Sequence, residues 1–398
     1  MNSVEIITKE QCFSCRACEH TCPTDCIRME EDVEGFLYPV IDSTLCTSCG
    51  ACLLHCPAHA PLRLIGEYSQ LFYGLKLRDE HQLQKSASGG LFYGLARYVL
   101  DQGGTVFGAA YDDQLGVHQI AVSDGDALYR LRGSKYVASD TETSYVQVKE
   151  ALKTGVPVLY TGVPCQIAGL RWFLGKDAEN LFTADIICHG VPSQKLFKRY
   201  LEWLSKRLKE PVLYYGFRDK DVAGWSCGGK TKTKTKTKTK VLRGAVDPYY
   251  SSFMRGETYR YSCYSCPYAS VRHRPADITM GDFWGVELFH PEFNTEGGVS
   301  CCIINTKKGE LLFKLVRDKF ICIQTTEESV SRYNRQLNQP VEYPKKRDSV
   351  YDGIDELPIE QFIKKLYAPL PSQIKRYVIG LIPQKLKTKV KQLLVHIC

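Results

Sequence analysis

Two runs of closely spaced cysteines near the start of the chain have the spacing of iron–sulfur ligands. "CFSCRACEHTCP" begins at Cys12 and "CTSCGACLLHCP" begins at Cys46; each holds three cysteines at Cys-x-x-Cys spacing and a fourth cysteine before a proline. Three thiolates of one tight loop reach three irons of a cube, and the fourth cysteine of each run ligates the other cluster. The predicted ligands are Cys12, Cys15, Cys18 and Cys56 for one 4Fe-4S cluster and Cys46, Cys49, Cys52 and Cys22 for the second.

The competing interpretation of these eight cysteines is a zinc ribbon. Zinc sites rarely need three cysteines within seven residues followed by Cys-Pro, so iron–sulfur clusters are the better interpretation. The repeat resembles that of bacterial two-cluster ferredoxins. Cys26 lies outside the pattern, and we interpret it as a buried or spare thiol. Two neighbouring clusters conduct electrons but bind no organic substrate, so the rest of the chain must provide the destination.

A separate Cys-x-x-Cys pair, Cys263 and Cys266, supplies half of a further cluster site. Cys165 and Cys188 each follow a predicted buried strand. If those strands lie in one mostly parallel sheet, both cysteines fall at the edge where such sheets bind ligands. The four cysteines would then complete a third 4Fe-4S site. The spacing alone leaves the alternative open that Cys165 and Cys188 are inert core thiols.

The segments around these cysteines predict alternating strands and helices. We expect a helix over about 90–102, strands near 105, 156–160 and 183–187, and helices that begin near Cys165 and Ser193. Free backbone N–H groups at the start of the first helix suit a phosphate, although Ser and Gly are also ordinary cap residues there. The residues at that start are Ser86, Ser88, Gly89 and Gly90.

The composition is that of a globular protein with two or three domains. The chain has 398 residues, 44% hydrophobic and 24% charged, with 18 cysteines; clustered Cys-x-x-Cys spacing without an apolar signal core favours metal sites over disulfides. Because no run of about 18 apolar residues occurs, we expect no membrane span and a cytoplasmic location. The net charge of +8 is uneven, since residues 1–66 have nine acids and four bases. This distribution does not favour nucleic-acid binding.

Six motifs follow one another along the remainder of the chain. They are "SGG" (Ser88–Gly90), "RGSKYVAS" (Arg132–Ser139), "TGVPCQIAGLR" (Thr161–Arg171), "CHGVPS" (Cys188–Ser193), "GFRDKDVAGW" (Gly216–Trp225) and "CYSCPYASVRHRPADITMGDFWG" (Cys263–Gly285). In this order they resemble the beta subunit of coenzyme F-420-reducing hydrogenase and dehydrogenase, a family that includes plant 7-hydroxymethyl chlorophyll a reductase. The resemblance covers roughly residues 70–340, and many bacterial members carry an N-terminal two-cluster ferredoxin domain.

The resemblance implies a flavin, FAD, beside a 4Fe-4S cluster held by Cys165, Cys188, Cys263 and Cys266. A lysine or a backbone N–H stabilises the negative charge of a reduced flavin, and Lys135 is the candidate catalytic residue. Without the motif, Lys135 would be interpreted as a solvated surface lysine. The residues that match segments near the flavin are Ser88, Gly89, Gly90, Ser134, Lys135, Tyr136, Thr161, Gly162 and Pro164.

Four charged residues of the last motif have two interpretations each. Asp277 and Asp282 either stabilise glycine-rich turns or contact the flavin ribose. Arg272 and Arg274 either pair with a pyrophosphate or pair with the acidic N-terminal region.

Two basic segments depart from these motifs. "GGKTKTKTKTKTKV", residues 228–241, is compatible with an edge hairpin whose strand has a Lys face and a Thr face and contributes no core residue. Residues 361–398 hold eight Lys or Arg and no acid, and Pro383 should kink the helix predicted there. Such a helix can lie on an anionic membrane, or dock on the body or on an acidic partner. Its apolar positions are Ile374, Val378, Leu381, Leu386, Val390, Leu393 and Ile397.

The predicted fold class is α+β. A two-cluster ferredoxin domain (1–66) precedes an α/β flavin and 4Fe-4S domain with a mostly parallel sheet (67–345) and a basic amphipathic tail (346–398). The predicted function is an oxidoreductase that exchanges electrons with a ferredoxin or flavodoxin and an unidentified small-molecule substrate. The alternatives are an electron-transfer subunit whose substrate chemistry lies on a partner and a regulatory protein with structural clusters.

Overall fold

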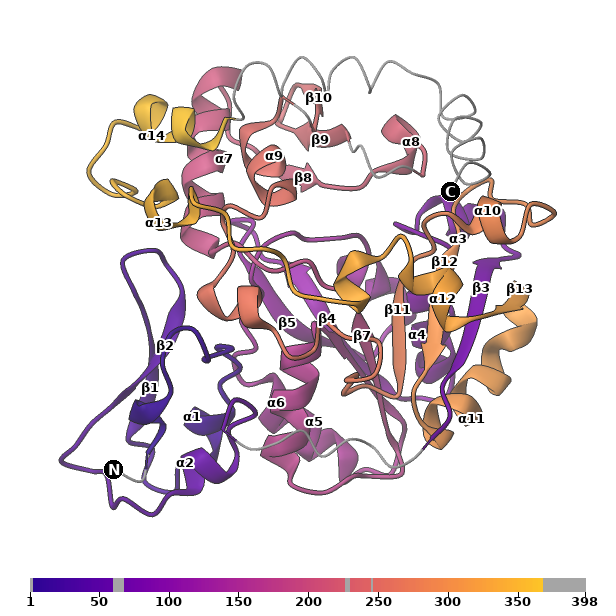
Figure 1. Cartoon of the computed structure of the whole chain (residues 1–398), viewed down its shortest axis with the longest axis horizontal. Helices are drawn as coiled ribbons and strands as arrows, with labels where there is room; N and C mark the ends of the chain where they lie inside the picture. Colours follow the sequence, from indigo (N-terminus) through magenta and orange to yellow (C-terminus); the bar gives the residue numbers. More distant parts are fainter. Residues whose placement is uncertain (1–2, 60–67, 226–229, 245, 368–398) are drawn as a thin grey trace.

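A central sheet of eight strands forms the middle of the molecule (Figure 1). The computed structural model describes residues 3–59, 68–225, 230–244 and 246–367. We call residues 3–59 the head and the described residues from 68 onward the body. Within these residues, no helix is long and apolar enough to cross a membrane.

The order of strands in the central sheet is β13-β3-β12-β11-β7-β6-β4-β5. The central strands β11, β7, β6 and β4 are parallel, and β12, β3, β13 and β5 are added antiparallel on the two sides. The predicted α+β fold is confirmed. The strand bounds are β3 Leu71–Leu77, β4 Thr105–Tyr111, β5 Val117–Val122, β6 Val158–Gly162, β7 Leu181–Ile186, β11 Ile278–Asp282, β12 Ser300–Ile304 and β13 Phe320–Thr325.

Helices connect the strands, and the predicted helices near 90, 165 and 193 are present. Their bounds are α3 Glu80–Gln84, α4 Leu91–Asp101, α5 Ser144–Leu152, α6 Pro164–Leu174, α7 Gln194–Leu208, α8 Lys220–Ala223, α9 Pro248–Met254, α10 Val286–Phe289, α11 Lys307–Val316, α12 Glu327–Ser331, α13 Arg347–Val350 and α14 Ile359–Leu366. Short 3-10 turns are η2 Gly125–Leu131, η3 Tyr261–Ser265, η4 Arg317–Lys319 and η5 Arg335–Leu337.

The two faces of the sheet are covered by different helices because side chains alternate along each strand. On β6, Val158 and Tyr160 pack with α5 and α6, whereas Leu159 between them packs with α4 on the opposite face. The strands of the parallel core are therefore buried on both faces, and their carboxyl ends meet at one edge of the sheet.

A smaller sheet holds the Lys-Thr repeat. Its strand order is β10-β9-β8, formed by Tyr214–Gly216 (β8), Lys230–Lys234 (β9) and Thr239–Arg243 (β10). The hairpin and its two-faced strand are present, but β9 is the middle strand and Thr231 and Thr233 are fully buried. The expectation that the repeat contributes no core residue is thus wrong, because the Thr231 hydroxyl donates to buried Asp247 at 2.9 Å.

The head contains one antiparallel hairpin and the two cysteine loops. Its elements are η1 Val4–Ile6, α1 Ala17–Thr21, β1 Ile27–Glu31, β2 Leu37–Ile41 and α2 Ala51–Leu54. Cys12 and Cys15 precede α1 and Cys18 lies within it, whereas Cys49 precedes α2 and Cys52 lies within it. The two halves of the head repeat one plan, as the sequence repeat predicts.

The loop between β1 and β2 attaches the head to the body. Phe36 is 1% exposed and packs in the apolar core formed by α7, α9, α13 and α14. The Ser193 hydroxyl donates to the carbonyl of Glu34 at 2.6 Å, and Arg347 donates to the Glu34 carboxylate, with Nη1 to Oε1 at 2.8 Å. Gly35 has φ +82°, and a Cβ there would lie 2.2 Å from a side-chain atom of α7. The loop therefore fits closely against the body.

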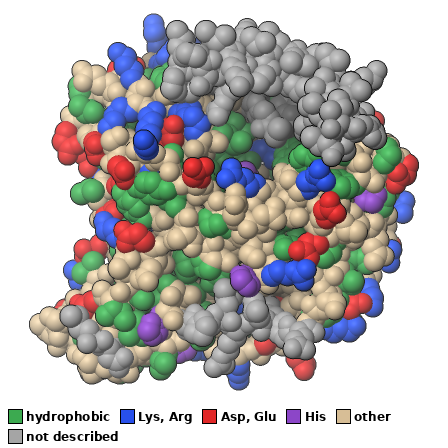
Figure 2. Space-filling view, in the orientation of Figure 1, with side chains coloured by type: hydrophobic (Ala, Val, Ile, Leu, Met, Phe, Trp, Pro, Cys, Tyr) green, Lys and Arg blue, Asp and Glu red, His purple; other side chains and the backbone are tan. Residues whose placement is uncertain are grey.

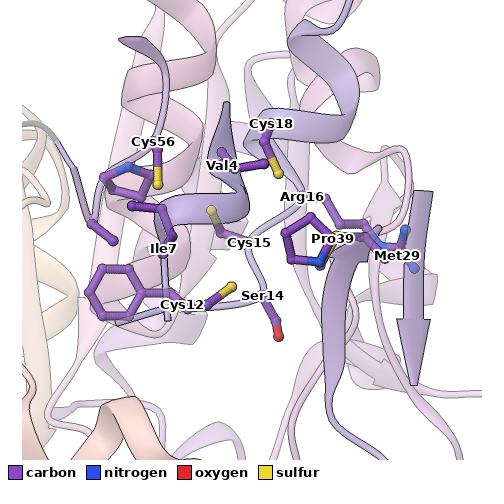
Figure 3. Close-up of a pocket in the computed structure, with 13 residues that line it drawn as sticks. Val4, Ile7, Cys12, Ser14, Cys15, Arg16, Cys18, Met29, Pro39 and Cys56 are labelled. Atoms are coloured by element: carbon purple, nitrogen blue, oxygen red, sulfur yellow. The ribbon is translucent and has the colours of Figure 1, made fainter. Parts of the chain in front are cut away.

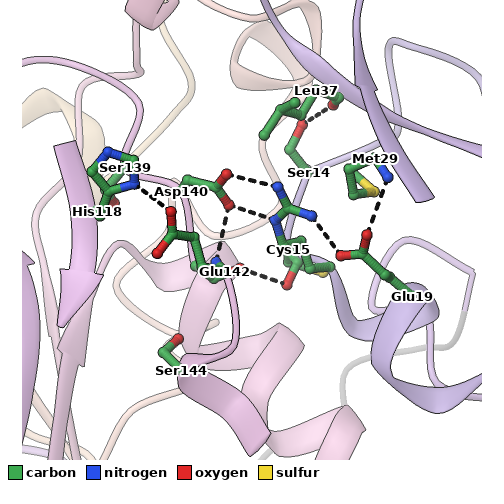
Figure 4. A network of polar contacts seen from close by, with 12 residues as sticks. Ser14, Cys15, Glu19, Met29, Leu37, His118, Ser139, Asp140, Glu142 and Ser144 are labelled. Carbon is green, nitrogen blue, oxygen red and sulfur yellow. Dashed lines mark hydrogen bonds and ion pairs between the residues drawn. The ribbon is translucent and has the colours of Figure 1, made fainter. Parts of the chain in front are cut away.

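A second attachment lies beside α1 (Figure 4). Arg16 donates to both carboxylate oxygens of Asp140, at 2.5 and 2.7 Å, and to Glu19 at 2.6 Å. The hydroxyl of Thr141 donates to the carbonyl of Cys15 at 3.2 Å. Two neighbouring residues of the body thus hold the loop that carries the first three cysteines.

The described part of the predicted tail packs on the body. α14 contacts α7 and α9, and Phe362, Ile363 and Leu366 are fully buried there. The predicted amphipathic positions from Ile374 to Ile397, with Pro383, lie outside the described residues. On the face shown in Figure 2, basic and acidic side chains are interspersed.

Candidate functional site

The first predicted set of cysteines surrounds one small cavity in the head. Cys12, Cys15, Cys18 and Cys56 line it, and Figure 3 shows their sulfur atoms turned toward the same space. Burial raises the pKa of each of these thiols, that of Cys15 to about 12. Cys56 comes from the second cysteine run, so the structure brings together the crossed combination that the spacing predicts.

The second predicted set lies in the other half of the head. Cys22, Cys46 and Cys52 belong to one apolar cluster, and Cys49, whose side chain is exposed, adjoins Cys52. Cys26 is buried as predicted, with its sulfur 3.3 Å from that of Cys22. Among the eight cysteines of the two sets in the head, Cys49 alone is exposed.

The third predicted set is assembled from three separate segments. Cys165 lies in the first turn of α6, Cys188 follows β7, and Cys263 and Cys266 lie in and after η3. Burial raises the pKa of all four thiols, and neighbouring thiolates raise it further for Cys165, Cys188 and Cys266, to about 12 for Cys188 and about 11 for Cys266. Four neighbouring, partly buried thiolates repel one another. Added positive charge would stabilise them, and iron ions would supply it.

In none of these sets do the cysteine side chains surround a single metal-ion position. Within the described residues, no three His, Cys, Asp or Glu side chains lie close enough to hold one metal ion. A four-iron cluster binds one thiolate at each of four irons, so its cysteines surround a space rather than a point.

Helix α6 joins the first and third sets. Gly169 lies one helical turn after Cys165, on the same side of the helix. A Cβ at Gly169 would lie 2.7 Å from the Cβ of Cys15 and 2.9 Å from its sulfur, so only glycine permits this approach. The rings of Phe13 and Tyr268 also meet, with centroids 5.6 Å apart, between the two sets. The first and third sets are therefore connected through directly packed residues, Gly169 of α6 against Cys15 and Phe13 against Tyr268.

A large cavity of about 350 Å³ opens beside the third set and has a volume typical of a cofactor or ligand site. Cys165 and Cys188 line it, at the carboxyl edge of the parallel strands. The residues of the resemblance that line it are Ser88, Gly90, Ser134, Lys135, Tyr136, Thr161 and Gly162.

Gly89 and Pro164 lie behind the wall of this cavity. A Cβ at Gly89 would lie 2.2 Å from the carbonyl oxygen of Leu75 and 2.4 Å from the amide nitrogen of Ser300, so the backbone of Gly89 packs on the sheet. Pro164 is buried as the first residue of α6. Both residues shape segments that border the cavity without lining it.

Comparison with known proteins decides the class of both parts. Residues 11–60 match the model of the 4Fe-4S dicluster domain, and residues 156–329 match that of the coenzyme F420 hydrogenase/dehydrogenase beta subunit, C terminus. The chain thus joins a region that matches 4Fe-4S dicluster domains to a region that matches the beta-subunit family of F420 hydrogenases and dehydrogenases. These matches relate its parts to iron–sulfur electron-transfer proteins and to oxidoreductases.

Two individual proteins are similar to parts of the chain. Ferredoxin-type protein NapF of Haemophilus influenzae is 34% identical over 58 residues, which are 15% of this chain and 32% of NapF. The chain thus spans about a third of the length of that curated relative. A chain in a xenon-derivatised structure of the F420-reducing NiFe hydrogenase complex from Methanosarcina barkeri is 19% identical, with a TM-score of 0.44, over 76% of this chain and 91% of that one.

Lys135, the candidate catalytic residue, borders the cavity. Its ammonium group donates to the backbone carbonyls of Arg132 at 2.9 Å, Arg130 at 3.2 Å and Gly133 at 3.4 Å. Burial lowers the pKa of Lys135 to about 7. The lysine is therefore not a solvated surface residue, and its charge changes near neutral pH.

The sequence motif "GFRDKDVAGW" supplies side chains at this site that no sequence argument singled out. Arg218 pairs with the Asp282 carboxylate at 2.5 Å and lies 5.4 Å from the ring centre of Trp284, and all three line the cavity. Lys220 is buried and donates to the carbonyls of Leu83 and Ser88, both at 2.7 Å. The close spacing of Arg, Asp and Lys in this motif is the sequence feature that could have indicated their place at the cavity.

The structure decides between the two interpretations given for each charged residue of the Cys263–Gly285 motif. Asp277 is buried and accepts from the Thr183 hydroxyl at 2.7 Å, so it joins β7 to the start of β11. Arg274 is buried and pairs with Asp185 at 2.6 Å. Arg272 pairs at the surface with Glu327 at 2.5 Å. Neither arginine lines the cavity or pairs with the head, so both expectations for them are wrong, whereas Asp282 does line the cavity.

A flavin fits the cavity by the chemistry of its wall. The aromatic rings of Tyr136, Phe253 and Trp284 provide flat apolar surface, Arg260 provides positive charge, and the Arg218–Asp282 pair provides polar groups. The N-terminus of α4, at Gly90 and Leu91, opens onto the same space, and the free N–H groups of a helix start suit a phosphate. The volume, aromatic surface and positive charge together suit a flat ring with a phosphate tail.

Proposed function

We propose that the chain is an iron–sulfur flavoprotein oxidoreductase that passes electrons between a ferredoxin-type carrier, three 4Fe-4S clusters and FAD, to or from a small organic substrate. The observation that carries this proposal is the series of sites from the exposed Cys49, through the first and third cysteine sets, to the cavity. A flavin bound there would convert single electrons into a two-electron reaction.

The ligands in this proposal are the twelve cysteines of the three sets. Clusters held by these sets would supply one-electron chemistry. The exposed set would face a ferredoxin or flavodoxin, the set around Cys15 would hold the middle cluster, and the set around Cys165 would hold the cluster beside the cavity. Gly169 supports the middle step, because its contact with Cys15 brings two sets together. Arg218, Lys135 and the start of α4 would hold the flavin.

The test is the cofactor content and turnover of the full chain purified without oxygen. We expect a brown protein with about twelve irons and about one flavin per chain. Reduced ferredoxin should reduce the flavin. A colourless protein that contains zinc would refute the proposal, and a flavin that is reduced but never reoxidised by small molecules would favour an electron-transfer subunit.

The rate of flavin reduction is expected to fall as pH rises through about 7, because Lys135 loses its charge there. A single charge near a reacting ring changes the barrier by about 1–4 kcal/mol. We therefore expect the rate to decrease by at least about tenfold, since about 1.4 kcal/mol corresponds to a factor of ten. Stopped-flow measurements between pH 6 and 8.5 would show the inflection. Lys135→Met should react slowly at every pH without it, and Lys135→Arg should stay fast. An inflection that persists in Lys135→Met would assign it to another group.

A further inference from the structure

Arg260 occupies the junction between the first and third cysteine sets. It is 7% exposed, and its Nη1 donates to the carbonyl of Phe13, the residue after Cys12, at 2.6 Å. Its own carbonyl accepts from the amide of Cys263 at 3.0 Å. The hydroxyl of Ser262 donates to the carbonyl of Cys12 at 2.9 Å. The segment of Arg260 thus ties the backbone of one cysteine set to the backbone of the other.

The guanidinium of Arg260 is not neutralised by a carboxylate. In the described part of the chain, no Asp or Glu forms an ion pair with it, and its Nε has no hydrogen-bond partner. It lies 5.2 Å from the ring centre of Phe36. The buried Arg347 and Arg274, by contrast, pair with Glu34 and Asp185. Because a guanidinium is always protonated in proteins, Arg260 keeps a full positive charge in a poorly solvated place.

This charge lies beside both neighbouring sets. The guanidinium is bonded to the backbone of Phe13, between Cys12 and Cys15, and the backbone of Arg260 is bonded to that of Cys263. Arg260 also lines the cavity that Cys165 and Cys188 line. Among the described residues, none of the hydrogen bonds of Arg260 involves the exposed set.

We propose that Arg260 raises the one-electron reduction potentials of the first and third clusters relative to the exposed cluster, and so directs electrons inward. This inference rests on the proposed function. Each cluster accepts one electron from the external carrier and gains one negative charge, and no bond breaks and no proton moves. A nearby fixed positive charge stabilises the reduced form more than the oxidised form, and it does so most strongly where water is excluded.

A purely structural role for Arg260 would depend on its hydrogen bond to Phe13 rather than on its charge. Two variants separate the roles. Arg260→Gln keeps a hydrogen-bond donor and removes the charge, whereas Arg260→Lys keeps the charge and removes the planar guanidinium. Arg255→Gln is the matched control, because Arg255 has a side chain 12% exposed on the same segment and its charge is compensated by Glu257 at 2.7 Å.

The experiment is a redox titration of the full holoprotein, followed by electron paramagnetic resonance, with iron counted in each sample. In Arg260→Gln we expect two of three midpoint potentials to fall by at least a tenfold change in equilibrium constant, about 59 mV for one electron. The third should stay fixed as an internal reference. Arg260→Lys and Arg255→Gln should resemble wild type. The cluster held by Cys266 is assigned by its absence from Cys266→Ala.

Unchanged potentials in an iron-replete Arg260→Gln protein would overturn the inference. Equal decreases in Arg260→Gln and Arg260→Lys would also overturn it, because they would assign the effect to the shape and packing of the guanidinium and not to its charge. If Arg260→Gln loses iron, Tyr38→Glu tests the same charge, because Tyr38 lies within electrostatic range of Arg260. That variant should lower the same two potentials, and unchanged potentials would count against the inference. Absence of the clusters from wild type would instead refute the proposed function.

Discussion

Replacing Cys266 with Ala is expected to remove about four of about twelve irons per chain, as one cube is lost, and to slow flavin reduction by an external donor strongly. The slower flavin reduction is expected because of where the cluster held by Cys266 would lie. Cys266 belongs to the only predicted set whose members, Cys165 and Cys188, line the large cavity, and α6 connects that set to Cys15. Loss of this cluster would interrupt the route between the head and the cavity.

The two clusters of the head should remain reducible in this variant, because their eight ligands lie in residues 12–56. Iron analysis, electron paramagnetic resonance and stopped-flow reduction of the flavin measure the three effects. Cys322→Ala is the matched control, since Cys322 lies in β13 and belongs to none of the three sets. Unchanged iron content and unchanged flavin reduction in Cys266→Ala would show that Cys263 and Cys266 have only a structural role. Loss of all irons would show that the protein needs this site to fold.

Replacing Arg347 with Met is expected to destabilise the attachment of the head by about 3–5 kcal/mol. Arg347 is fully buried and holds the Glu34 carboxylate, whose side chain is only 12% exposed. It also donates to the carbonyl of Tyr259 at 2.6 Å and lies 4.1 Å from the ring centre of Tyr261. Removing one partner of a buried pair leaves the other charge without compensation, which costs more than the pair itself contributes.

Limited proteolysis at the head–body junction and the thermal midpoint would measure this loss. Glu34→Gln should be milder, and the double variant should be less unstable than the sum of the two single variants, because the pair is coupled. Lys195→Met is a control on the same loop contact, where a partly exposed lysine pairs with Asp355 and should contribute at most about 1 kcal/mol. Wild-type proteolysis and midpoint in Arg347→Met would show that the hairpin loop does not hold the head.

The cysteine sets in the head could be predicted because their ligands are close in sequence. The crossed pairing of Cys56 with Cys12, Cys15 and Cys18 follows from the spacing, and the structure brings those four together. The set around Cys165 could not be predicted from cysteine spacing alone. Its four cysteines come from three segments, and they meet only when β6 and β7 are parallel neighbours in the sheet. The family resemblance supplied that information before the structure did.

The polar side chains of the cavity were harder to predict because their roles depend on distant partners. Arg274 and Arg272 resemble anion ligands in sequence, but the first is neutralised by Asp185 from β7 and the second by Glu327. Arg260 and Arg218 stand out only after the fold shows which carboxylates are near each arginine. The buried face of the Lys-Thr repeat likewise depends on Asp247, which no local pattern connects to Thr231.

The close fit of the β1–β2 loop has a consequence for kinetics. The head is fastened at two separated places, the Glu34 loop against α7 and Arg347 and the Arg16 loop against Asp140, with Cys15 packed on α6 between them. A unit clamped in this way cannot swing on a tether as a mobile carrier domain does. Internal electron transfer would therefore occur over a constant tunnelling distance, with a rate that follows the driving force and is independent of solvent viscosity.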